Sequence, residues 1–293
     1  MNTLEINNLQ KKIDKDFVLG PLNTEIEPGS VVALVGSNGS GKSTLFQMIM
    51  GLVKHDEGSI KVMNVNAGEP EMKKSTAYLP QSLVVQGKFT MRQLADLNKL
   101  AFADWSETIF QEYVQKFGIP LNKRLDKMSG GIQKKAFLAI QLSRSSSLLL
   151  LDEPYAGLDF AGQEMLDEEI IKYMERSENQ TVLFASHSGD EIKRIADYIW
   201  LVHQGRHIGI FEKDELQQNW RRVWIKDSLA IKNDTPGLIS VNQADGSLIT
   251  KNNSQTLESL KKKGIEVLHT QPMDLREILT ELLKKEEKGE KLI

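Results

Sequence analysis

The chain has 293 residues, a length that indicates one large domain or two unequal ones, and its 40% hydrophobic and 26% charged residues exclude disorder throughout. A net charge of −3 argues against a protein that binds nucleic acid through clustered cations. Because cysteine is absent, disulfide scaffolds, cysteine nucleophiles and thiolate metal sites are excluded. We also expect neither a signal peptide nor a membrane span, since every apolar run falls far short of the ~20 residues that cross a bilayer.

The first residues follow the pattern of an α/β protein. Residues 4–6 and 22–26 have the character of strands, and the continuous apolar run at 31–35 is typical of a parallel strand buried on both faces. A glycine-rich turn comes next, followed by a helix with apolar residues at 45–49 that ends at Gly51. Strand, turn and helix together predict the opening unit of an α/β sheet.

Helices then interrupt the sheet. We expect a helical subdomain at about residues 85–145, which includes a capping box formed by Thr90 and Gln93. Strand patterns return at 148–151, 181–186 and 198–202.

The composition changes near residue 219. Short strand candidates at 223–225, 247–250 and 265–268, with amphipathic helices near 254–263 and after Asp274, predict a small α+β appendage. We therefore expect two domains, residues 1–218 and residues 219–293.

The turn after the third strand matches the phosphate-binding pattern G-x-x-x-x-G-K-[ST] in the context that the pattern needs, between a strand and a helix. Glycines let backbone N–H groups surround phosphates, and the helix N-terminus favours anions. The lysine reaches the β- and γ-phosphates, and the next hydroxyl can ligate Mg²⁺. The alternative, an incidental glycine-rich turn, is disfavoured by both flanking elements. The predicted nucleotide-binding residues are Gly36, Ser37, Asn38, Gly39, Ser40, Gly41, Lys42, Ser43 and Thr44.

Two acidic residues end the apolar strand at 148–151. Ligands of open parallel sheets bind beyond the carboxyl ends of the strands, so we expect both carboxylates to face the nucleotide. Asp152 is then a metal-shell ligand, and Glu153 a candidate base for the water that attacks the γ-phosphate. Alone, such a pair would be an ordinary strand end, and its significance comes from the phosphate loop.

The segment Ser129-Gly130-Gly131 opens another helix and predicts a second anion-binding surface. One phosphate loop already holds a nucleotide, so we expect this surface to serve the nucleotide of another subunit. By itself the segment would be an ordinary helix cap.

Taken in order, these motifs resemble the ATP-binding subunit of bacterial ABC transporters over about residues 2–215. The resemblance implies an α/β fold, namely a P-loop NTPase sheet with an ABC-type antiparallel β subdomain and a helical subdomain, here followed by the C-terminal appendage. It also implies an ATPase that uses ATP and Mg²⁺.

The resemblance adds three residues. Gln81 resembles the residue that touches Mg²⁺ or the attacking water, His187 the residue that orients the catalytic glutamate, and Asp159 the residue that couples two cassettes. It therefore implies a catalytic set and a metal set, which are Glu153, His187 and Gln81, and Ser43, Gln81 and Asp152. One departure is Ile13, which stands where the family usually places an aromatic side chain under adenine.

Diffuse features resemble the ABC-2-type exporter branch, among them Ala103-Asp104-Trp105 and the C-terminal appendage. That resemblance implies export of a peptide, antibiotic or other amphipathic cargo. It further implies a second cassette and an integral membrane permease as partners, no nucleic-acid partner, and a peripheral location on the cytoplasmic face of the membrane.

Three other functions are weighed, of which the first two remain as alternatives. A soluble ATPase switch of the same superfamily usually joins two cassettes or inserts a long coiled coil, and only 87 positions separate Lys42 from Ser129 here. A catalytically silent cassette of a heterodimer is disfavoured because Glu153 and His187 are both present. A small-molecule kinase would leave the Ser129 surface without a role.

Overall fold

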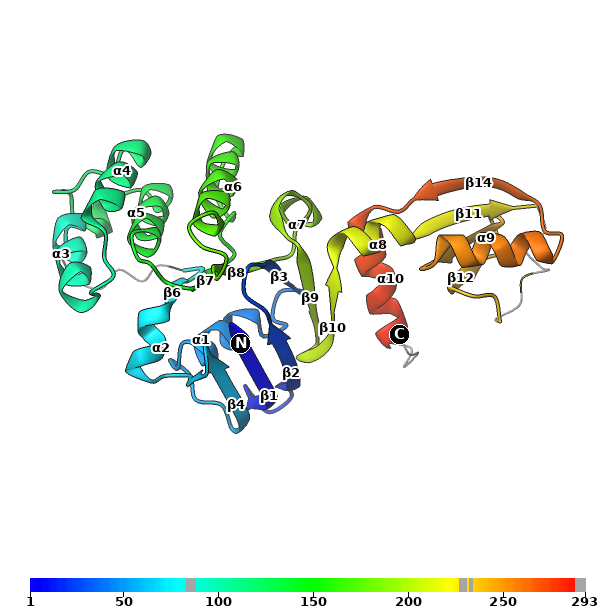
Figure 1. Cartoon of the computed structure of the whole chain (residues 1–293), viewed down its shortest axis with the longest axis horizontal. Coiled ribbons are helices and arrows are strands. Elements are labelled where there is room, and N and C mark those ends of the chain that lie inside the picture. The colour runs from blue at the N-terminus through cyan, green and yellow to red at the C-terminus, as the bar shows by residue number, and fades with distance from the viewer. Residues whose placement is uncertain (83–87, 227–230, 232–233, 288–293) are drawn as a thin grey trace. The chain divides into compact units, whose positions relative to one another are not determined.

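The computed structural model describes residues 1–82, 88–226, 231 and 234–287 (Figure 1). The chain forms two compact units, one of Met1–His187 with Arg194–Gly209, and one of Ser188–Lys193 with Ile210–Ile293. The division into residues 1–218 and 219–293 stays a prediction. The compact units differ from it chiefly because residues 210–218 group with the C-terminal unit.

The first unit contains most of the elements. They are β1 (Leu4–Lys12), β2 (Val18–Ile26), β3 (Val31–Val35), α1 (Lys42–Ile49), β4 (Glu57–Val62), β5 (Val65–Asn66), α2 (Pro70–Ser75), β6 (Thr76–Leu79), α3 (Met91–Ala101), α4 (Glu107–Phe117), the 3₁₀ turn η1 (Leu125–Lys127), α5 (Gly130–Leu142), β7 (Leu148–Asp152), α6 (Phe160–Met174), β8 (Thr181–Ser186) and β9 (Tyr198–His203).

A six-stranded sheet forms the centre of the first unit, in the order β10-β9-β3-β8-β7-β6, where β10 is Arg206–Glu212. The strands β9, β3, β8, β7 and β6 pair in parallel. Every residue of β3, β7 and β8 is buried, which is why these strands read as continuous apolar runs. The carboxyl ends of neighbouring strands therefore meet at one edge of the sheet.

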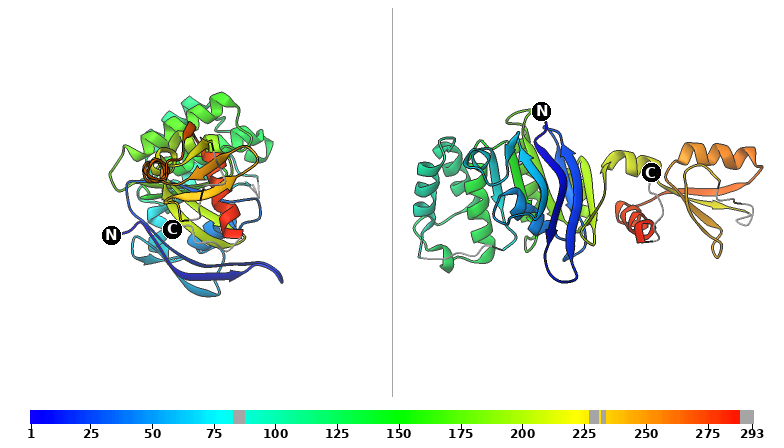
Figure 2. Two further views of the ribbon diagram at one scale, coloured as in Figure 1. Left: turned by 90° about the vertical axis from the view of Figure 1, so that its right-hand side faces the viewer. Right: turned by 90° about the horizontal axis from the view of Figure 1, so that it is seen from below.

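A second, antiparallel sheet has the order β2-β1-β4-β5 and is drawn in blue and cyan (Figure 2). Helix α1 contacts both β4 of this sheet and β7 of the central sheet. The family fold expected from the sequence is thus confirmed, with its parallel core, antiparallel β subdomain and helices.

The helical insert contains α3, α4, η1 and α5, and both α3 and α4 contact α5. The predicted capping box is present, since the Thr90 hydroxyl accepts from the Gln93 N–H and the Gln93 side chain accepts from the Thr90 N–H. The expected start of the insert, residue 85, lies outside the described residues.

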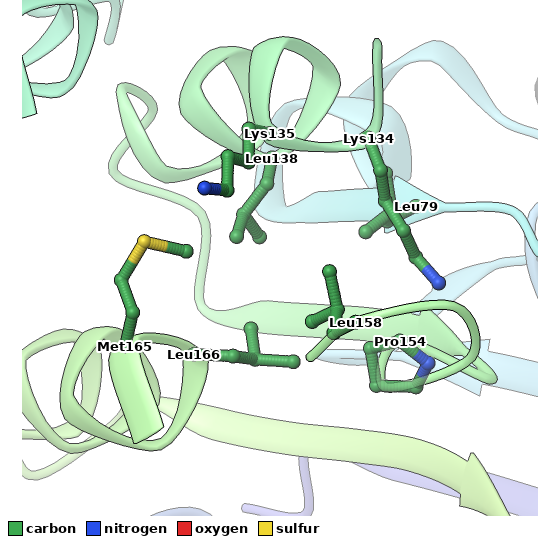
Figure 3. A pocket seen from close by; sticks show the side chains of 8 residues that line it. All are labelled: Leu79, Lys134, Lys135, Leu138, Pro154, Leu158, Met165 and Leu166. Atoms are coloured by element: carbon green, nitrogen blue, oxygen red, sulfur yellow. The ribbon is translucent and has the colours of Figure 1, made fainter. Parts of the chain in front are cut away.

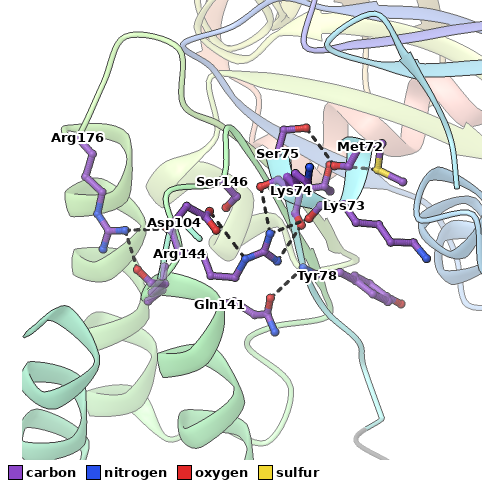
Figure 4. A network of polar contacts seen from close by, with 12 residues as sticks. Met72, Lys73, Lys74, Ser75, Tyr78, Asp104, Gln141, Arg144, Ser146 and Arg176 are labelled. Atoms are coloured by element: carbon purple, nitrogen blue, oxygen red, sulfur yellow. Dashed lines mark hydrogen bonds and ion pairs between the residues drawn. The ribbon is translucent and has the colours of Figure 1, made fainter. Parts of the chain in front are cut away.

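A polar network joins the end of α5 to β6, which is an edge strand of the central sheet (Figure 4). The guanidinium of buried Arg144 donates to the carbonyl oxygens of Lys73, Lys74 and Thr76 at 2.7, 3.1 and 3.1 Å. The Tyr78 N–H donates to Gln141 Oε1 at 3.3 Å. The insert and the sheet edge are therefore bonded to one another.

The second unit contains an antiparallel sheet of order β12-β13-β11-β14 around a small apolar core. That core is built on buried Val223, Ile225, Leu248 and Leu260. No helix among the described residues combines the length and apolar character needed to cross a bilayer. Helix α7 (Gly189–Ile195), like β10, has residues in both units. The elements of the second unit are α8 (Lys213–Asn219), β11 (Arg221–Ile225), β12 (Leu238–Asn242), β13 (Ser247–Thr250), α9 (Asn253–Lys262), β14 (Val267–Pro272) and α10 (Leu275–Glu287).

Candidate functional site

Most of the predicted site residues gather at the carboxyl ends of four adjacent strands, and Ser129–Gly131 and Asp159 are the exceptions. The phosphate loop follows β3, His187 follows β8, Asp152 and Glu153 end and follow β7, and Gln81 comes two residues after β6. Since β3, β8, β7 and β6 are consecutive in the sheet, residues up to 151 positions apart in the chain (187 − 36) meet at one edge.

The phosphate loop, Gly36–Thr44, leads from β3 into α1, which begins at Lys42. Gly36 is required by close approach, because a Cβ there would lie 2.5 Å from both Ser40 Oγ and the Val202 carbonyl oxygen. Lys42 is buried and its ammonium group donates to the Gly36 and Ser37 carbonyl oxygens at 2.8 and 3.2 Å. The loop therefore holds a desolvated cation at the N-terminus of a helix, where anions are favoured.

Asp152 is only 2% exposed, and its Oδ1 has no hydrogen-bond partner among the described residues. Burial raises the pKa of this carboxyl and the neighbouring Glu153 carboxylate adds to the rise, whereas bonds from the Ser43 hydroxyl and the Gln81 backbone N–H oppose it. A buried carboxylate oxygen without a partner, beside a hydroxyl, fits a Mg²⁺ ion. This ion prefers oxygen donors and commonly takes one or two protein ligands together with substrate phosphates.

Glu153 lies at the centre of a charged cluster and is 6% exposed. Its carboxylate is 3.1 and 3.3 Å from His187 Nδ1, and Oε1 is 3.7 Å from Lys42 Nζ. Its backbone has a φ of 48°, a left-handed conformation that costs a non-glycine residue free energy, and the following Pro154 normally favours an extended residue before it. The structure thus brings Lys42, Glu153 and His187 into contact.

Gln81 enters the site through its backbone, whose N–H lies near enough to Asp152 to oppose the rise in the pKa of that carboxyl. The Gln81 side chain is exposed, and its amide group makes no hydrogen bond to the carboxylates of Asp152 and Glu153 among the described residues. The predicted side-chain contacts of Gln81 remain a prediction.

Ser129, Gly130 and Gly131 form the exposed N-terminus of α5. Unlike Thr90 and Asp159, which cap their helices with their own side chains, Ser129 makes no capping bond to a described residue. No described hydrogen bond joins this segment to the phosphate loop of the same chain. A helix N-terminus with an open hydroxyl therefore faces outward.

Asp159 is exposed and caps α6, since its Oδ1 accepts from the Gly162 N–H at 2.9 Å. Within one chain its role is therefore that of a helix cap. Its predicted contact with a second cassette remains a prediction.

An open hollow of about 540 Å³ adjoins the phosphate loop. Residues Ser37–Ser40 line one side, and Phe17, Arg206 and neighbours from the β1–β2 and β9–β10 loops line the rest. Ile13 is 41% exposed and is absent from this lining. Sequence reasoning missed Phe17, although it is the one aromatic residue between the first two strands.

Comparison with known proteins gives one consistent relationship. The family model described as "ABC transporter" matches residues 19–156. The chain is 30% identical over 207 residues to the lantibiotic transport ATP-binding protein SrtF of Streptococcus pyogenes, which covers 70% of this chain and 89% of that protein. It is 26% identical over 282 residues to the ABC transporter ATP-binding protein YtrB of Bacillus subtilis (strain 168), covering 94% and 96%.

Another similar protein is named for a different cargo. The manganese transport system ATP-binding protein MntA of Synechocystis is 29% identical over 66% of this chain and 79% of that protein. A solved structure of an ATP-binding subunit of an ABC transporter superposes with a TM-score of 0.67 at 24% identity, over 74% of this chain and 92% of that chain, and shows the shared fold.

Proposed function

The chain belongs to the ABC transporter family as an ATP-binding, ATP-hydrolysing subunit, and from this premise we propose that it drives an exporter of peptide, antibiotic or other amphipathic cargo. In this proposal two cassettes bind Mg-ATP between them and move a membrane-spanning partner. The observation that carries the site assignment is the meeting of Lys42, Glu153 and His187 at adjacent strand ends, with the Ser43 hydroxyl and Asp152 close to one another beside them.

Phosphate binding follows from the loop. Backbone N–H groups of residues 36–44 surround the phosphates, and the Lys42 ammonium, now 3.7 Å from Glu153 Oε1, turns toward the γ-phosphate. Ser43 and Asp152 would hold Mg²⁺, which would neutralise negative charge on the phosphates. Phe17 offers a ring against which the base stacks. It thereby takes the role of the aromatic residue that was expected at the position of Ile13.

We assign roles in hydrolysis to Glu153, His187 and Gln81. The Glu153 carboxylate accepts the proton of the attacking water, whose oxygen bonds to the γ-phosphorus as the bond to the β–γ bridging oxygen breaks. His187, in contact with both carboxylate oxygens, fixes the orientation of Glu153. We assign to Gln81, whose backbone lies near Asp152, the contact with the metal or the water.

The second cassette supplies the opposite face of each nucleotide. Ser129 and Gly131 lie on an exposed helix end that has no described hydrogen bond to the phosphate loop of its own chain, and such an end binds anions through free N–H groups and a hydroxyl. Charge-assisted bonds to the γ-phosphate then hold two chains together until hydrolysis removes that group.

Export and membrane association rest on the relatives. The similarity to a lantibiotic transport protein at 30% identity supports an amphipathic peptide as cargo, and the similarity to YtrB extends over nearly the whole chain. A peripheral position on the cytoplasmic face of the membrane follows from a permease partner. We expect the chain to co-purify with a hydrophobic polypeptide from solubilised membranes, and inside-out vesicles to accumulate a cationic amphipathic peptide when ATP is added.

The test of the motor itself is the Glu153→Gln variant. It should lose ATP turnover and, with Mg-ATP, elute as a dimer in gel filtration, because the γ-phosphate stays in place. Glu175→Gln, at an exposed position after α6, is the matched control and should behave as the wild type. Normal turnover in Glu153→Gln, or a strictly monomeric variant with ATP, contradicts the proposal.

A further inference from the structure

We infer that Lys134, on α5, is a positioning residue that holds the backbone of Glu153 in its catalytic conformation. The inference rests on the function proposed above and names a residue that none of the motifs singles out. Lys134 Nζ donates to the Glu153 carbonyl oxygen at 2.8 Å and to the Ala156 carbonyl oxygen at 3.0 Å. A single ammonium group therefore closes the turn that immediately follows β7.

The turn needs such support because its first residue is strained. Glu153 has a φ of 48° and precedes Pro154, two conditions that each disfavour its backbone conformation. Its carbonyl oxygen otherwise receives only the long bond from the Ala156 N–H, at 3.2 Å, among the backbone bonds of the described residues. Strained residues persist where the surrounding structure fixes them.

Holding this carbonyl group also aims the carboxylate. The Glu153 carbonyl group and side chain both follow rotation about its N–Cα bond, so a change in the strained φ that displaced the carbonyl group would also move the carboxylate relative to His187 and Lys42. The Glu153 carboxylate is 3.1 Å from His187 Nδ1 and 3.7 Å from Lys42 Nζ, so a small movement of the carboxylate would break these contacts. A displacement of about 1 Å at a reacting group can lower turnover about 100-fold.

The aliphatic part of the Lys134 side chain lies beside apolar residues, while its ammonium group reaches the partly buried Glu153 carbonyl oxygen and the exposed Ala156 carbonyl oxygen. The cavity beside the side chain has a volume of about 10 Å³ and is lined by apolar side chains that include Leu138, Leu158 and Leu166 (Figure 3). A volume of this size is at the lower limit for one water molecule. In the same view, Lys134 extends toward the loop with Pro154, whereas the nitrogen of Lys135 points away from it.

The position of Lys134 on α5 links the Glu153 contact to the N-terminus of that helix. Ser129 stands at the N-terminus of the same helix five residues earlier, so the helix end proposed to bind the nucleotide of a second cassette is continuous with the group that holds Glu153 of its own site. Lys134 thereby joins the two proposed half-sites of one chain.

The test is steady-state ATP hydrolysis by the full chain. Lys134→Met keeps the length of the side chain and removes its donors, so kcat should fall about 10- to 100-fold while KM for ATP changes less than about threefold. Lys135→Met is the matched control, because the structure gives Lys135 no hydrogen bond or ion pair with a described residue, and it should retain the wild-type kcat.

A chemical rescue separates positioning from folding. The sequence has no cysteine, so in the Lys134→Cys variant a single thiol can be alkylated. Aminoethylation rebuilds a side chain of lysine length with an amine, whereas ethylation adds an apolar group of similar size. We expect kcat to recover at least about fivefold with aminoethylation and to stay low with ethylation.

The outcomes are distinct. A wild-type kcat in Lys134→Met, a loss confined to KM, or equal kcat after both alkylations overturns the role of Lys134 while Glu153→Gln still loses turnover. If the wild type has no turnover, or Glu153→Gln retains it, the proposed function itself fails and the inference fails with it.

Discussion

Replacing Asp152 by Asn should stabilise the nucleotide-free protein while abolishing its activity. Asp152 is 2% exposed, Oδ1 has no partner among the described residues, and the Glu153 carboxylate lies next to it. Because burial and this like charge disfavour the ionised form, an amide of nearly the same shape removes an unfavourable charge. The amide oxygen can still accept from Ser43 and from the Gln81 N–H.

The magnitude follows from the missing partner. A buried polar atom without a hydrogen bond costs about 1–3 kcal/mol, more when it is charged, and the bonds that the remaining oxygen accepts offset part of this. We therefore expect Asp152→Asn to raise the free energy of unfolding by about 1–2 kcal/mol. At about 2–4 °C per kcal/mol for a domain of this size, Tm rises by about 2–8 °C.

Asp167→Asn is the matched control, since the same chemical change should have the opposite sign. The Asp167 carboxylate accepts from the Tyr155 hydroxyl and, at 2.6 Å, from Arg194 Nε. Losing charge-assisted bonds at this partly exposed site should lower Tm by about 2–8 °C.

The assay is thermal denaturation of the nucleotide-free full chain, repeated with ATP in the presence and absence of Mg²⁺. The extra stabilisation that Mg²⁺ gives the wild type with ATP should be smaller in Asp152→Asn, because binding to the native state is what raises Tm. Equal decreases of Tm in Asp152→Asn and Asp167→Asn would refute the reasoning, because they would mean that the Asp152 carboxylate is as well paired as that of Asp167.

Three further predictions concern other parts of the chain. Phe17→Ala should raise KM for ATP by about 5- to 30-fold, the equivalent of about 1–2 kcal/mol of stacking, in an ATPase assay in which Ile13→Ala is unchanged. His207 Nδ1 accepts from Trp200 Nε1 at 2.8 Å and burial lowers the pKa of His207. The unfolded chain then binds a proton at His207 near pH 6.5 and the folded chain does not, so the urea midpoint of the wild type should decrease as the pH is lowered from 7.5 to 5.5. The decrease should be smaller in His207→Gln, and an equal decrease in both proteins would contradict this role of His207. Leu260→Ala, at a fully buried position, should destabilise the second unit by about 2–5 kcal/mol in urea denaturation, and a loss under 1 kcal/mol argues against the core described there.

Buried parallel strands could be predicted from the sequence because their signal is local. The apolar run at 31–35 coincides with β3, and the run at 181–186 with β8, since both faces of these strands are covered. The edge strand β14 was expected at 265–268 and lies at Val267–Pro272. Its side chains are mostly exposed, so no hydrophobic alternation marked its register.

The convergence of the site was predictable to the same extent as the strand ends. Lys42, Glu153 and His187 each follow a buried strand, and the order of parallel strands brings them together. The bonds of Lys134 were not predictable, because they depend on how α5 lies across the turn after β7 rather than on any local pattern. The hollow beside Phe17 likewise forms only when two hairpin loops meet the phosphate loop.

The bonds between α5 and β6 have a consequence for how the molecule meets other proteins. An unpaired strand edge is a template onto which a foreign strand can add, and β6 ends the central sheet. Here Arg144 bonds the Thr76 carbonyl oxygen and Gln141 accepts from the Tyr78 N–H, so side chains occupy part of that edge. Addition of a foreign strand on this side is thus hindered, which discourages aggregation in a subunit whose proposed association is a specific one.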